Sequence, residues 1–356
     1  MNSDRPLFRS LEDAVPQDWG RLAAYLASRG LAFDGGSAPR QFAGGFANLN
    51  YLVQIDGQEV VLRRPPIGPL PPGAYDMGRE HRILSRLHEH FPLAPRGLHH
   101  CDDVTVLGAP FQLTEFRRGI SIRDELPSEW AARHDIGELL SRTLVQTLAS
   151  LHRIEPAAVG LGDLGRPEGF LARAADGWRK RATLAFSIST HQQPLLRIVG
   201  DWIGANVVPD RSASLLHNDF KLDNLLLNAD AEPVAVLDWD QGTRGDGLFD
   251  LATLLSYWTE HDDPTELRAM RQMPTPLPGF LKRRDVLQAY ATQSGRDLSE
   301  FRFHLALAYL KTAVIFQQLY VRYHAGETRD LRYAAFEPVA AALLQRAHDV
   351  AYHGVR

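Results

Sequence analysis

The sequence predicts an α+β protein with two lobes, a small lobe built on an antiparallel sheet followed by a larger, mostly helical lobe. Three observations support this prediction. Short β-like runs dominate the first 116 of the 356 residues, amphipathic helical segments dominate residues 117–356, and a single β interruption breaks that helical series. We therefore expect an N-terminal lobe with a leading helix over residues 1–116 and a C-terminal lobe over residues 117–356.

The small lobe is expected to begin with an amphipathic helix and to continue mainly as strands. The helix is predicted over Trp19–Gly30, and a second one over about Met77–His90. Asp56-Gly57 lies between two β-like runs and is typical of a type I′ hairpin turn, because that turn needs positive φ angles. Strands are predicted at Arg40–Ala43, Asn50–Ile55, Glu59–Arg63, Val104–Leu107 and Phe111–Phe116.

The larger lobe is expected to be a series of helices joined to the small lobe by a hinge at Arg117-Arg118-Gly119. The β interruption consists of Leu225–Leu227 and Val234–Leu237, separated by a turn-like segment. Helices are predicted at Ile136–His152, Gly169–Thr183, Leu195–Ala205, Phe249–Trp258, Arg284–Gln293, Phe301–Tyr323 and Ala334–Tyr352.

Composition narrows the classes of function. Hydrophobic residues make up 44% and charged residues 23% of the chain, which is typical of a globular protein. The formal net charge of −4 argues against nucleic acid or an anionic membrane as the main partner. Cys101 is the single cysteine, so neither an internal disulfide nor a multi-thiolate zinc site can form. No apolar run reaches the roughly 18 residues of a membrane span, and Met1–Phe8 has no signal-peptide character, so we expect a cytoplasmic protein.

One segment carries the chemistry. Residues 217–224 read His-Asn-Asp-Phe-Lys-Leu-Asp-Asn, and Asp238 follows two short predicted strands. Phosphoryl transfer from MgATP needs a group that orients the attacking hydroxyl, ligands for the metal, and cations for the phosphoryl oxygens. A loop carboxylate, an amide five residues later and a second carboxylate after a strand pair can meet these needs, and oxygen ligands suit Mg²⁺. The order His-x-Asp-x₄-Asn…Asp is that of a kinase catalytic loop followed by its metal-binding Asp.

On these residues the chain resembles the aminoglycoside-phosphotransferase-like kinases, which have the protein-kinase-like fold. It is most similar to the branch whose kinase domain is also found fused to acyl-CoA dehydrogenases. The resemblance runs from about Arg40 to Tyr323 and implies a transferase that uses ATP and Mg²⁺. It also rests on the shorter motifs Gly44-Gly45, Val61-Leu62-Arg63, Arg79-Glu80, Gly160-Leu161-Gly162-Asp163 and Asp250-Leu251-Ala252.

The resemblance implies a role for each residue of the catalytic segment. Asp219 is implied as the base that orients the acceptor hydroxyl, and Lys221 as a cation that stabilises the γ-phosphoryl charge. Asn224 and Asp238 are implied as the metal ligands. Two further residues are implied as structural braces of the loop, His217 and Asp250.

Other polar residues near this segment receive structural interpretations. Asn218 stands where the family usually has glycine, so we expect a left-handed backbone there, which asparagine tolerates better than most residues. Asp223 is interpreted as solvated or as a local cap. Asp240 and Asp246 lie in a glycine-rich turn, where aspartate is common for structural reasons.

The small lobe is expected to bind the nucleotide. Gly44, Gly45 and Asn48 belong to a turn between two predicted strands, whose backbone N–H groups could cradle phosphates. Arg63 occupies the strand position where most kinases carry lysine, and we expect it to pair with Glu80 and with the α- and β-phosphates.

Arg64 is a competing candidate for the phosphate contact. Glu115 and Phe116 end the last strand of the small lobe and are expected to form the hinge that reads adenine through backbone groups. No Gly-x₄-Gly-Lys-Ser/Thr loop is present, so a P-loop mechanism is excluded.

The resemblance implies a 4-hydroxyacyl-CoA as the phosphoryl acceptor, with a separate acyl-CoA dehydrogenase acting on the product. Two cationic runs could contact the CoA phosphates, Arg179–Arg181 and Lys282–Arg284, although such runs are often solvated helix faces. The apolar stripe of helix 301–323 is interpreted as core, with an acyl-binding wall as the alternative.

Three other functions stay open. An aminoglycoside or amino-alcohol acceptor would require an acidic pocket, for which the candidates are Asp262, Asp263 and Glu266. A catalytically silent module that binds a nucleotide or an acyl-CoA is disfavoured, because the base and both metal ligands are present. A hydrolase built on Ser256, His261 and Asp262 lacks the nucleophile-elbow sequence.

Overall fold

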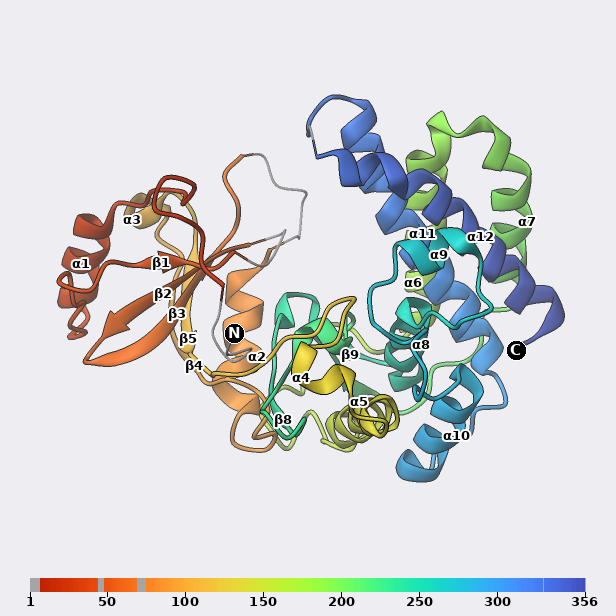
Figure 1. Cartoon of the computed structure of the whole chain (residues 1–356), viewed down its shortest axis with the longest axis horizontal. Coiled ribbons are helices and arrows are strands. Elements are labelled where there is room, and N and C mark those ends of the chain that lie inside the picture. The colour runs from red at the N-terminus through yellow and green to blue at the C-terminus, as the bar shows by residue number, and fades with distance from the viewer. Residues whose placement is uncertain (1–6, 44–47, 69–74, 329, 356) are drawn as a thin grey trace. The chain divides into compact units, whose positions relative to one another are not determined.

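The computed structural model describes residues 7–43, 48–68, 75–328 and 330–355 (Figure 1). The chain separates into two compact units, each assembled from more than one segment of sequence. Unit 1 consists of Met1–Ser121, Ala157–Gly162 and Asn224–Gly242. Unit 2 consists of Ile122–Pro156, Asp163–Asp223 and Thr243–Arg356. The lobe boundary after residue 116 stays a prediction.

Unit 1 is built on an antiparallel five-stranded sheet with the order β1-β2-β3-β5-β4. The turn between β2 and β3 has positive φ at both central residues, 50° at Asp56 and 74° at Gly57, which confirms the predicted hairpin. The strands are β1 (Arg40–Gln41), β2 (Leu49–Ile55), β3 (Gln58–Arg64), β4 (Gly97–Cys101) and β5 (Phe111–Glu115).

Two helices cover the sheet of unit 1, on opposite sides in Figure 1. Helix α1 (Trp19–Ser28) is capped by the Asp18 carboxylate and inserts Leu22 and Leu26 into the core beside the strands. Helix α2 (Met77–Leu87) is capped by Asp76 and buries one face, as its periodicity predicts.

One predicted strand is wrong. Val104–Leu107 forms a short helix, α3, and the sheet instead uses β4 (Gly97–Cys101), which the sequence did not indicate. The helix has ordinary end signals: the Asp103 carboxylate accepts from the Thr105 N–H at 2.9 Å, and Gly108 ends the helix with φ 79°. These two caps decide the conformation of a segment whose β-branched residues favour a strand.

The predicted β interruption is a hairpin that belongs to unit 1. Strand β7 (Leu225–Leu227) pairs antiparallel with β8 (Pro233–Val236). The backbone of Ile120 exchanges two hydrogen bonds with Leu227, at 2.8 and 3.0 Å. A Cβ at Gly119 would lie 3.0 Å from both Leu226 and Leu227, so this position fits glycine.

Unit 2 is mainly helical, and the seven predicted helices are confirmed with small shifts at their ends. Its described residues also contain a short antiparallel strand pair that was not predicted, β6 (Ser214–Leu216) with β9 (Thr243–Gly245). The helices are α4 (Ser128–Ala131), α5 (Ile136–His152), α6 (Phe170–Ala185), α7 (Gln193–Ala205), α8 (Gly247–Tyr257), α9 (Thr265–Ala269), α10 (Arg283–Ser294), α11 (Phe301–His324) and α12 (Phe336–His353).

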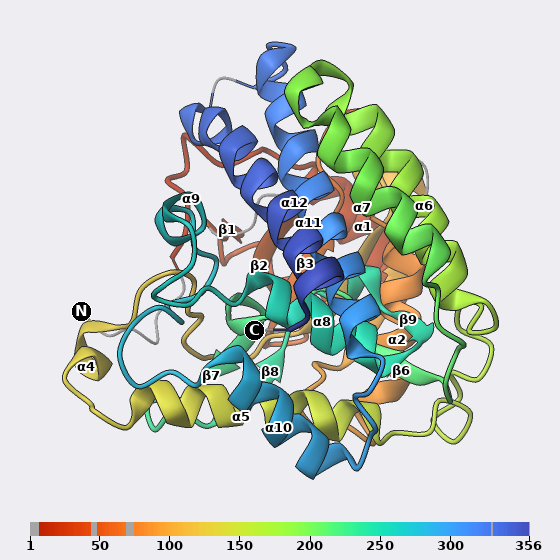
Figure 2. The ribbon, with the colours of Figure 1, turned by 90° about the vertical axis from the view of Figure 1, so that its right-hand side faces the viewer.

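Helix α11 is the central element of unit 2. Figure 2 shows it side by side with α12, and α6 and α7 lie next to this pair. Most residues of its first four turns are buried on every face, including Phe303, Leu307 and Leu310. A helix that is buried on all sides belongs to the core. The prediction that the apolar stripe of residues 301–323 forms core is therefore confirmed.

Candidate active site

The segment 217–223 follows strand β6 in unit 2 and forms the loop that carries Asp219. Asn218 has φ 63°, which confirms the left-handed backbone expected at this position. The Asp250 carboxylate accepts hydrogen bonds from the backbone N–H of His217 at 2.7 Å and of Asn218 at 2.8 Å. A strained backbone of this kind persists where the surroundings hold it on several sides.

Asp250 is buried in the first turn of α8 and belongs to a longer chain of polar contacts. Nε2 of His152 lies 3.2 Å from its carboxylate, and Nδ1 of His152 lies 2.7 Å from the Tyr290 hydroxyl. Burial alone would raise the pKa of Asp250, but the hydrogen bond and charge of His152, together with His217, hold it below the usual value. The loop is thus braced by an ionised carboxylate.

The Asp219 carboxylate has a different partner on each oxygen. Lys221 Nζ donates to Oδ2 at 2.9 Å, and the Tyr257 hydroxyl donates to Oδ1 at 2.9 Å. The backbone N–H of Asp219 donates to Nδ1 of His217 at 3.3 Å. Burial opposes ionisation, but Lys221, Lys311 and His217 together hold the pKa of Asp219 below its usual value. Asp219 is therefore anionic at neutral pH, as a hydroxyl-orienting base must be.

Tyr257 stays a neutral hydrogen-bond donor in this arrangement. Burial and the negative charge of Asp219 raise its pKa well above the usual value. Lys221 Nζ lies 5.0 Å from the centre of its ring, within range of a cation–π interaction. Lys221 and Tyr257 thus touch each other as well as Asp219.

Unit 1 holds a second cluster, centred on Arg63 of β3. Its guanidinium lies 2.8 Å from the Glu80 carboxylate on α2, forms an ion pair with Asp238 after β8, and lies 3.7 Å from Asp240. The Trp239 N–H donates to Glu80 at 3.3 Å, which ties α2 to the residue after Asp238. One cation is therefore shared by three carboxylates.

Burial affects the two central groups of this cluster in opposite ways. Burial opposes the charge of Arg63, but Asp238, Glu80 and Asp240 outweigh it and raise the pKa of the guanidinium. Burial raises the pKa of Glu80, and Arg63 only partly offsets this rise. Arg63 is therefore a permanent cation, and Glu80 depends on it to stay ionised.

Asn224 and Asp238 lie at the same end of the β7–β8 hairpin. The backbone carbonyl of Asn224 accepts from the Leu237 N–H at 2.8 Å, which brings the residue next to Asp238 close to Asn224. Asp238 has φ 67° and keeps 31% of its side chain exposed. An amide oxygen and a partly exposed carboxylate are hard donors that fit Mg²⁺ when phosphates and water complete its shell. Among the described residues, no group of three or more His, Cys, Asp or Glu side chains is placed to hold a metal.

The predicted phosphate turn lies partly outside the described residues, since Gly44 and Gly45 fall in the range 44–47. Asn48 is described and is 7% exposed. Within the described part of the chain, neither polar atom of its side chain has a hydrogen-bond partner. A buried amide without a partner costs stability, so this position fits an external polar ligand such as a nucleotide phosphate.

The two arginines that competed for the phosphate contact occupy different surroundings. Arg63 faces the carboxylates of Glu80 and Asp238. Arg64 is buried on the other side of β3, where it donates to Gln17 at 2.6 Å and to the Leu107 carbonyl. Strand alternation separates neighbouring side chains in this way, and it leaves Arg63 as the candidate.

Glu115 and Phe116 lie at the end of β5. The Glu115 N–H donates to the Arg96 carbonyl at 2.8 Å, and its carboxylate accepts from the Arg96 N–H and from Arg117. The Phe116 ring lies 6.1 Å from the Phe42 ring and packs against the Arg118 guanidinium. The Glu115 N–H is thus occupied, and an adenine at this strand end would be read by other backbone groups.

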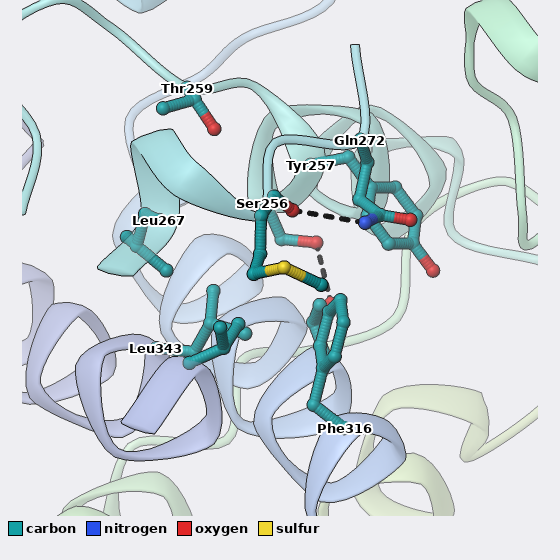
Figure 3. Close-up of a pocket in the computed structure, with 10 residues that line it drawn as sticks. Ser256, Tyr257, Thr259, Leu267, Gln272, Phe316 and Leu343 are labelled. Atoms are coloured by element: carbon teal, nitrogen blue, oxygen red, sulfur yellow. Dashed lines mark hydrogen bonds between the residues drawn. The ribbon is translucent and has the colours of Figure 1, made fainter. Parts of the chain in front are cut away.

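A partly open pocket lies within unit 2, beside Tyr257 (Figure 3), and its space of about 240 Å³ includes open solvent. Ser256 and Thr312 touch through their hydroxyl oxygens at 2.7 Å on its wall. None of its lining residues carries a charge. They are Ser256, Tyr257, Thr259, Leu267, Met270, Gln272, Thr312, Phe316, Val339 and Leu343.

The acidic residues that could have formed an aminoglycoside pocket have other positions. Asp263 is buried and forms an ion pair with Arg283, which also donates to the Trp258 carbonyl at 2.5 Å. Arg346 lies 3.9 Å from the same carboxylate. Asp262 and Glu266 are exposed. None of the three acidic candidates lines the pocket.

Sequence reasoning missed Tyr257, Lys311 and His152, which all contact the loop or its brace. The sequence separations of these contacts are 38 residues for Tyr257 to Asp219, 93 for Lys311 to Asn218 and 98 for His152 to Asp250. Each residue lies on a helix whose periodicity reads as core, so no local pattern marks it. The lysine at position 311 interrupts an apolar stretch of helix, but the sequence does not show that its side chain is buried.

Comparison with known proteins yields one family. The model of the phosphotransferase enzyme family matches residues 39–285. The chain is 29% identical over 330 residues to mouse acyl-CoA dehydrogenase family member 10, covering 91% of this chain and 30% of that protein. It is 31% identical over 329 residues to chicken acyl-CoA dehydrogenase family member 11, covering 87% and 40%. The chain thus spans less than half the length of these curated relatives.

Solved structures share the fold. A Ralstonia eutropha protein described only provisionally as an aminoglycoside phosphotransferase superposes with a TM-score of 0.75 at 22% identity, covering 96% of this chain and all of that one. A thermostable mutant of aminoglycoside phosphotransferase APH(4)-Ia, in complex with ADP and hygromycin B, superposes with a TM-score of 0.57 at 13% identity, covering 92% of this chain and 98% of that one. These likenesses confirm the predicted kinase-like α+β fold. No helix among the described residues has the length and apolarity to cross a membrane.

Proposed function

Because the chain belongs to the phosphotransferase enzyme family, we propose that it is an ATP-dependent kinase whose phosphoryl acceptor is the hydroxyl of a 4-hydroxyacyl-CoA. Phosphotransfer to an alcohol group is the activity of the family. The observation that carries the proposal is the Asp219 carboxylate, held anionic by Lys221 and braced on a loop fixed by Asp250. Such a carboxylate can accept the proton of an attacking hydroxyl.

In the proposed reaction, the acceptor oxygen forms a bond to the γ-phosphorus of ATP while the bond from that phosphorus to the β,γ-bridging oxygen breaks. The acceptor proton passes to Asp219, and ADP leaves. Lys221 carries positive charge for the γ-phosphoryl oxygens, and Arg63 does so for the α- and β-phosphates. Asn224 and Asp238 would hold Mg²⁺, which supplies charge neutralisation for the phosphates when bound.

The nucleotide side of this proposal rests on unit 1. Asn48 offers a buried amide whose polar atoms have no partner among the described residues, and Gly44 and Gly45 precede it in the sequence. Glu115 and Phe116 stand at the strand end expected to read adenine. The ADP complex of APH(4)-Ia supports nucleotide binding by this fold.

The acyl-CoA part of the proposal rests on charge. An aminoglycoside is polycationic and requires carboxylates around it. Here the pocket beside Tyr257 is lined by uncharged side chains, which are apolar, hydroxyl-bearing or, at Gln272, an amide. Asp263 is neutralised by Arg283, and the cations Lys221 and Lys311 act on Asp219. These features favour an uncharged acyl chain that carries a hydroxyl. The names of the curated relatives support the same class, and an acyl-CoA dehydrogenase would use the product.

The test is ADP release with MgATP across a panel of acceptors. The panel contains 4-hydroxyacyl-CoAs of increasing length, the matching acyl-CoAs that lack the hydroxyl, an aminoglycoside and choline. We expect turnover with the 4-hydroxyacyl-CoAs alone, a phosphomonoester in the product by phosphorus NMR, and loss of turnover in Asp219→Asn.

Three other outcomes would change the assignment. Turnover of the aminoglycoside or choline alone would replace the acceptor class and keep the reaction. Binding of MgATP with no turnover of any acceptor would favour the silent binding module. Turnover that survives Asp219→Asn would exclude the proposed base.

A further inference from the structure

Helix α11 contains a buried lysine that the proposed reaction does not use. Lys311 is 2% exposed, and lysines are rarely buried to this extent without a charged partner. Its Nζ donates to the backbone carbonyl of Asn218 at 2.5 Å and lies 3.4 Å from the Thr253 hydroxyl. The centre of the Phe249 ring is 5.4 Å away. Among the described residues, no carboxylate forms a salt bridge with Lys311.

The carbonyl that Lys311 binds belongs to the peptide bond joining Asn218 to Asp219. Asn218 is the residue with φ 63°, and its N–H is held by Asp250. Its two peptide groups are therefore clamped from different helices, the N–H by α8 and the carbonyl by α11. A non-glycine residue in this region of φ needs such support. The peptide that Lys311 fixes sets the direction in which the Asp219 side chain leaves the backbone.

The lysine also supplies charge. Burial lowers the pKa of Lys311 to about 8, although the carboxylates of Asp219 and Asp250 oppose this shift and Lys221 adds to it. These are the charged groups that face Lys311 from the loop and from α8. At neutral pH most Lys311 side chains are protonated, and the cation contributes to the low pKa of Asp219. Above pH 8 this contribution is lost.

We propose that Lys311 is a positioning residue for phosphoryl transfer, which holds the Asn218–Asp219 peptide so that Asp219 meets the acceptor hydroxyl. The inference rests on the proposed function, since it gives Lys311 its role through the base of that reaction. Misplacing a catalytic group by about 1 Å can cost on the order of 100-fold in rate. The expected loss is therefore in kcat and leaves the KM for ATP unchanged.

The experiment compares Lys311→Met with the wild type and with two further variants. Lys311→Met keeps the volume but removes both the donor and the charge, and we expect kcat to fall about 100-fold. Lys311→Gln keeps an N–H donor without a titrating charge, and we expect it to recover part of kcat. Gln317→Leu is the matched control, because it removes a buried polar contact to Ser189 from the same helix. We expect it to lower stability and to leave kcat unchanged.

The pH profile separates positioning from a general loss of stability. In the wild type, kcat is expected to fall as pH rises through about 8, where Lys311 loses its charge. This alkaline limb is expected to disappear in Lys311→Met and Lys311→Gln and to persist in Gln317→Leu. A Lys311→Met enzyme with wild-type kcat and the same alkaline limb would overturn the inference.

Hydrogen exchange provides a readout that needs no acceptor. Loss of the Lys311 contact is expected to speed amide exchange in the peptide covering residues 214–224 more than Gln317→Leu does. If no acceptor turns over, the proposed function fails, and this comparison alone decides whether Lys311 holds the loop. Equal exchange in the two variants would overturn the inference.

Discussion

The candidate functional carboxylates of the two units have opposite charge surroundings. In unit 1 a single cation, Arg63, is shared by Glu80, Asp238 and Asp240, so the cluster has surplus negative charge. In unit 2 the one carboxylate of Asp219 is influenced by two lysines, Lys221 and Lys311. Surplus negative charge with a partly exposed Asp238 is suited to a divalent cation. A carboxylate surrounded by cations is suited to stay ionised beside a phosphoryl group.

This contrast divides the expected roles. Unit 1 would bind the metal and the nucleotide, and unit 2 would activate the acceptor. Substitutions in unit 1 should therefore alter MgATP binding, and those around Asp219 should alter turnover.

The largest effect is expected at Asp219. Asp219→Asn keeps the shape and the Tyr257 contact but removes the charge that accepts the acceptor proton, and a general base contributes about 10²–10⁴-fold to rate. We expect kcat to fall by about 1,000-fold, with KM for ATP unchanged, in steady-state assays of ADP release. Asp223→Asn is the control from the same loop, because Asp223 pairs with Arg123 at 3.5 Å. Equal losses in the two variants would show that the effect is not specific to the base.

The next effect concerns stability in unit 1. Arg63→Met leaves Glu80 buried without its cation, and breaking a buried ion pair in this way costs about 3–5 kcal/mol. Urea unfolding should show this loss in Arg63→Met and a smaller one in the double variant Arg63→Met/Glu80→Gln, where no uncompensated charge is left at position 80. A double variant no more stable than Arg63→Met would show that Glu80 does not depend on the cation.

The smallest effect is expected in the pH dependence of stability, with opposite signs for Asp250 and Glu80. The folded-state pKa of Asp250 is lowered, so its contribution is present above its unfolded pKa of about 3.9 and is lost as pH falls through the folded value. The folded-state pKa of Glu80 is raised, so its ionised form costs stability at neutral pH. This cost shrinks as pH falls below the folded value and is gone below the unfolded value of about 4.3.

Urea unfolding between pH 7 and pH 3 measures both contributions. We expect the free energy of unfolding of Asp250→Asn to decrease less than that of the wild type as pH falls. The stability of Glu80→Gln relative to the wild type should decrease as pH falls. The same slope in all three proteins would contradict the pKa shifts.

Local sequence signals were sufficient for most elements of the fold. The helix periods gave α5 its bounds of Ile136–His152, and Asp56-Gly57 gave the β2–β3 hairpin. Pairings between distant segments were not visible, as for β6 with β9. At Val104–Leu107 the β-branched residues predicted a strand, although Asp103 and Gly108 carry the signals that begin and end a helix.

The residues of the candidate site also differ in whether local sequence signals predict them. Asp219, Asn224 and Asp238 were predicted because one loop and one hairpin place them at fixed spacing. Tyr257 and Lys311 were not predicted. Each contacts the loop from a helix far along the chain, and no local sequence pattern marks a polar side chain on an apolar helix as part of the site. The variants at positions 219 and 311 test two of these proposed roles, and a variant at position 238 tests a third.

The most direct test of the division between the units is stabilisation by MgATP. Binding at 100 times the Kd stabilises the folded state by about 2.7 kcal/mol, which thermal unfolding can resolve. We predict that MgATP raises the Tm of the wild type and of Asp219→Asn alike, and that Asp238→Ala abolishes the Mg²⁺-dependent part of the shift. A wild-type protein that MgATP does not stabilise, or an Asp238→Ala variant that responds as the wild type does, would contradict the account.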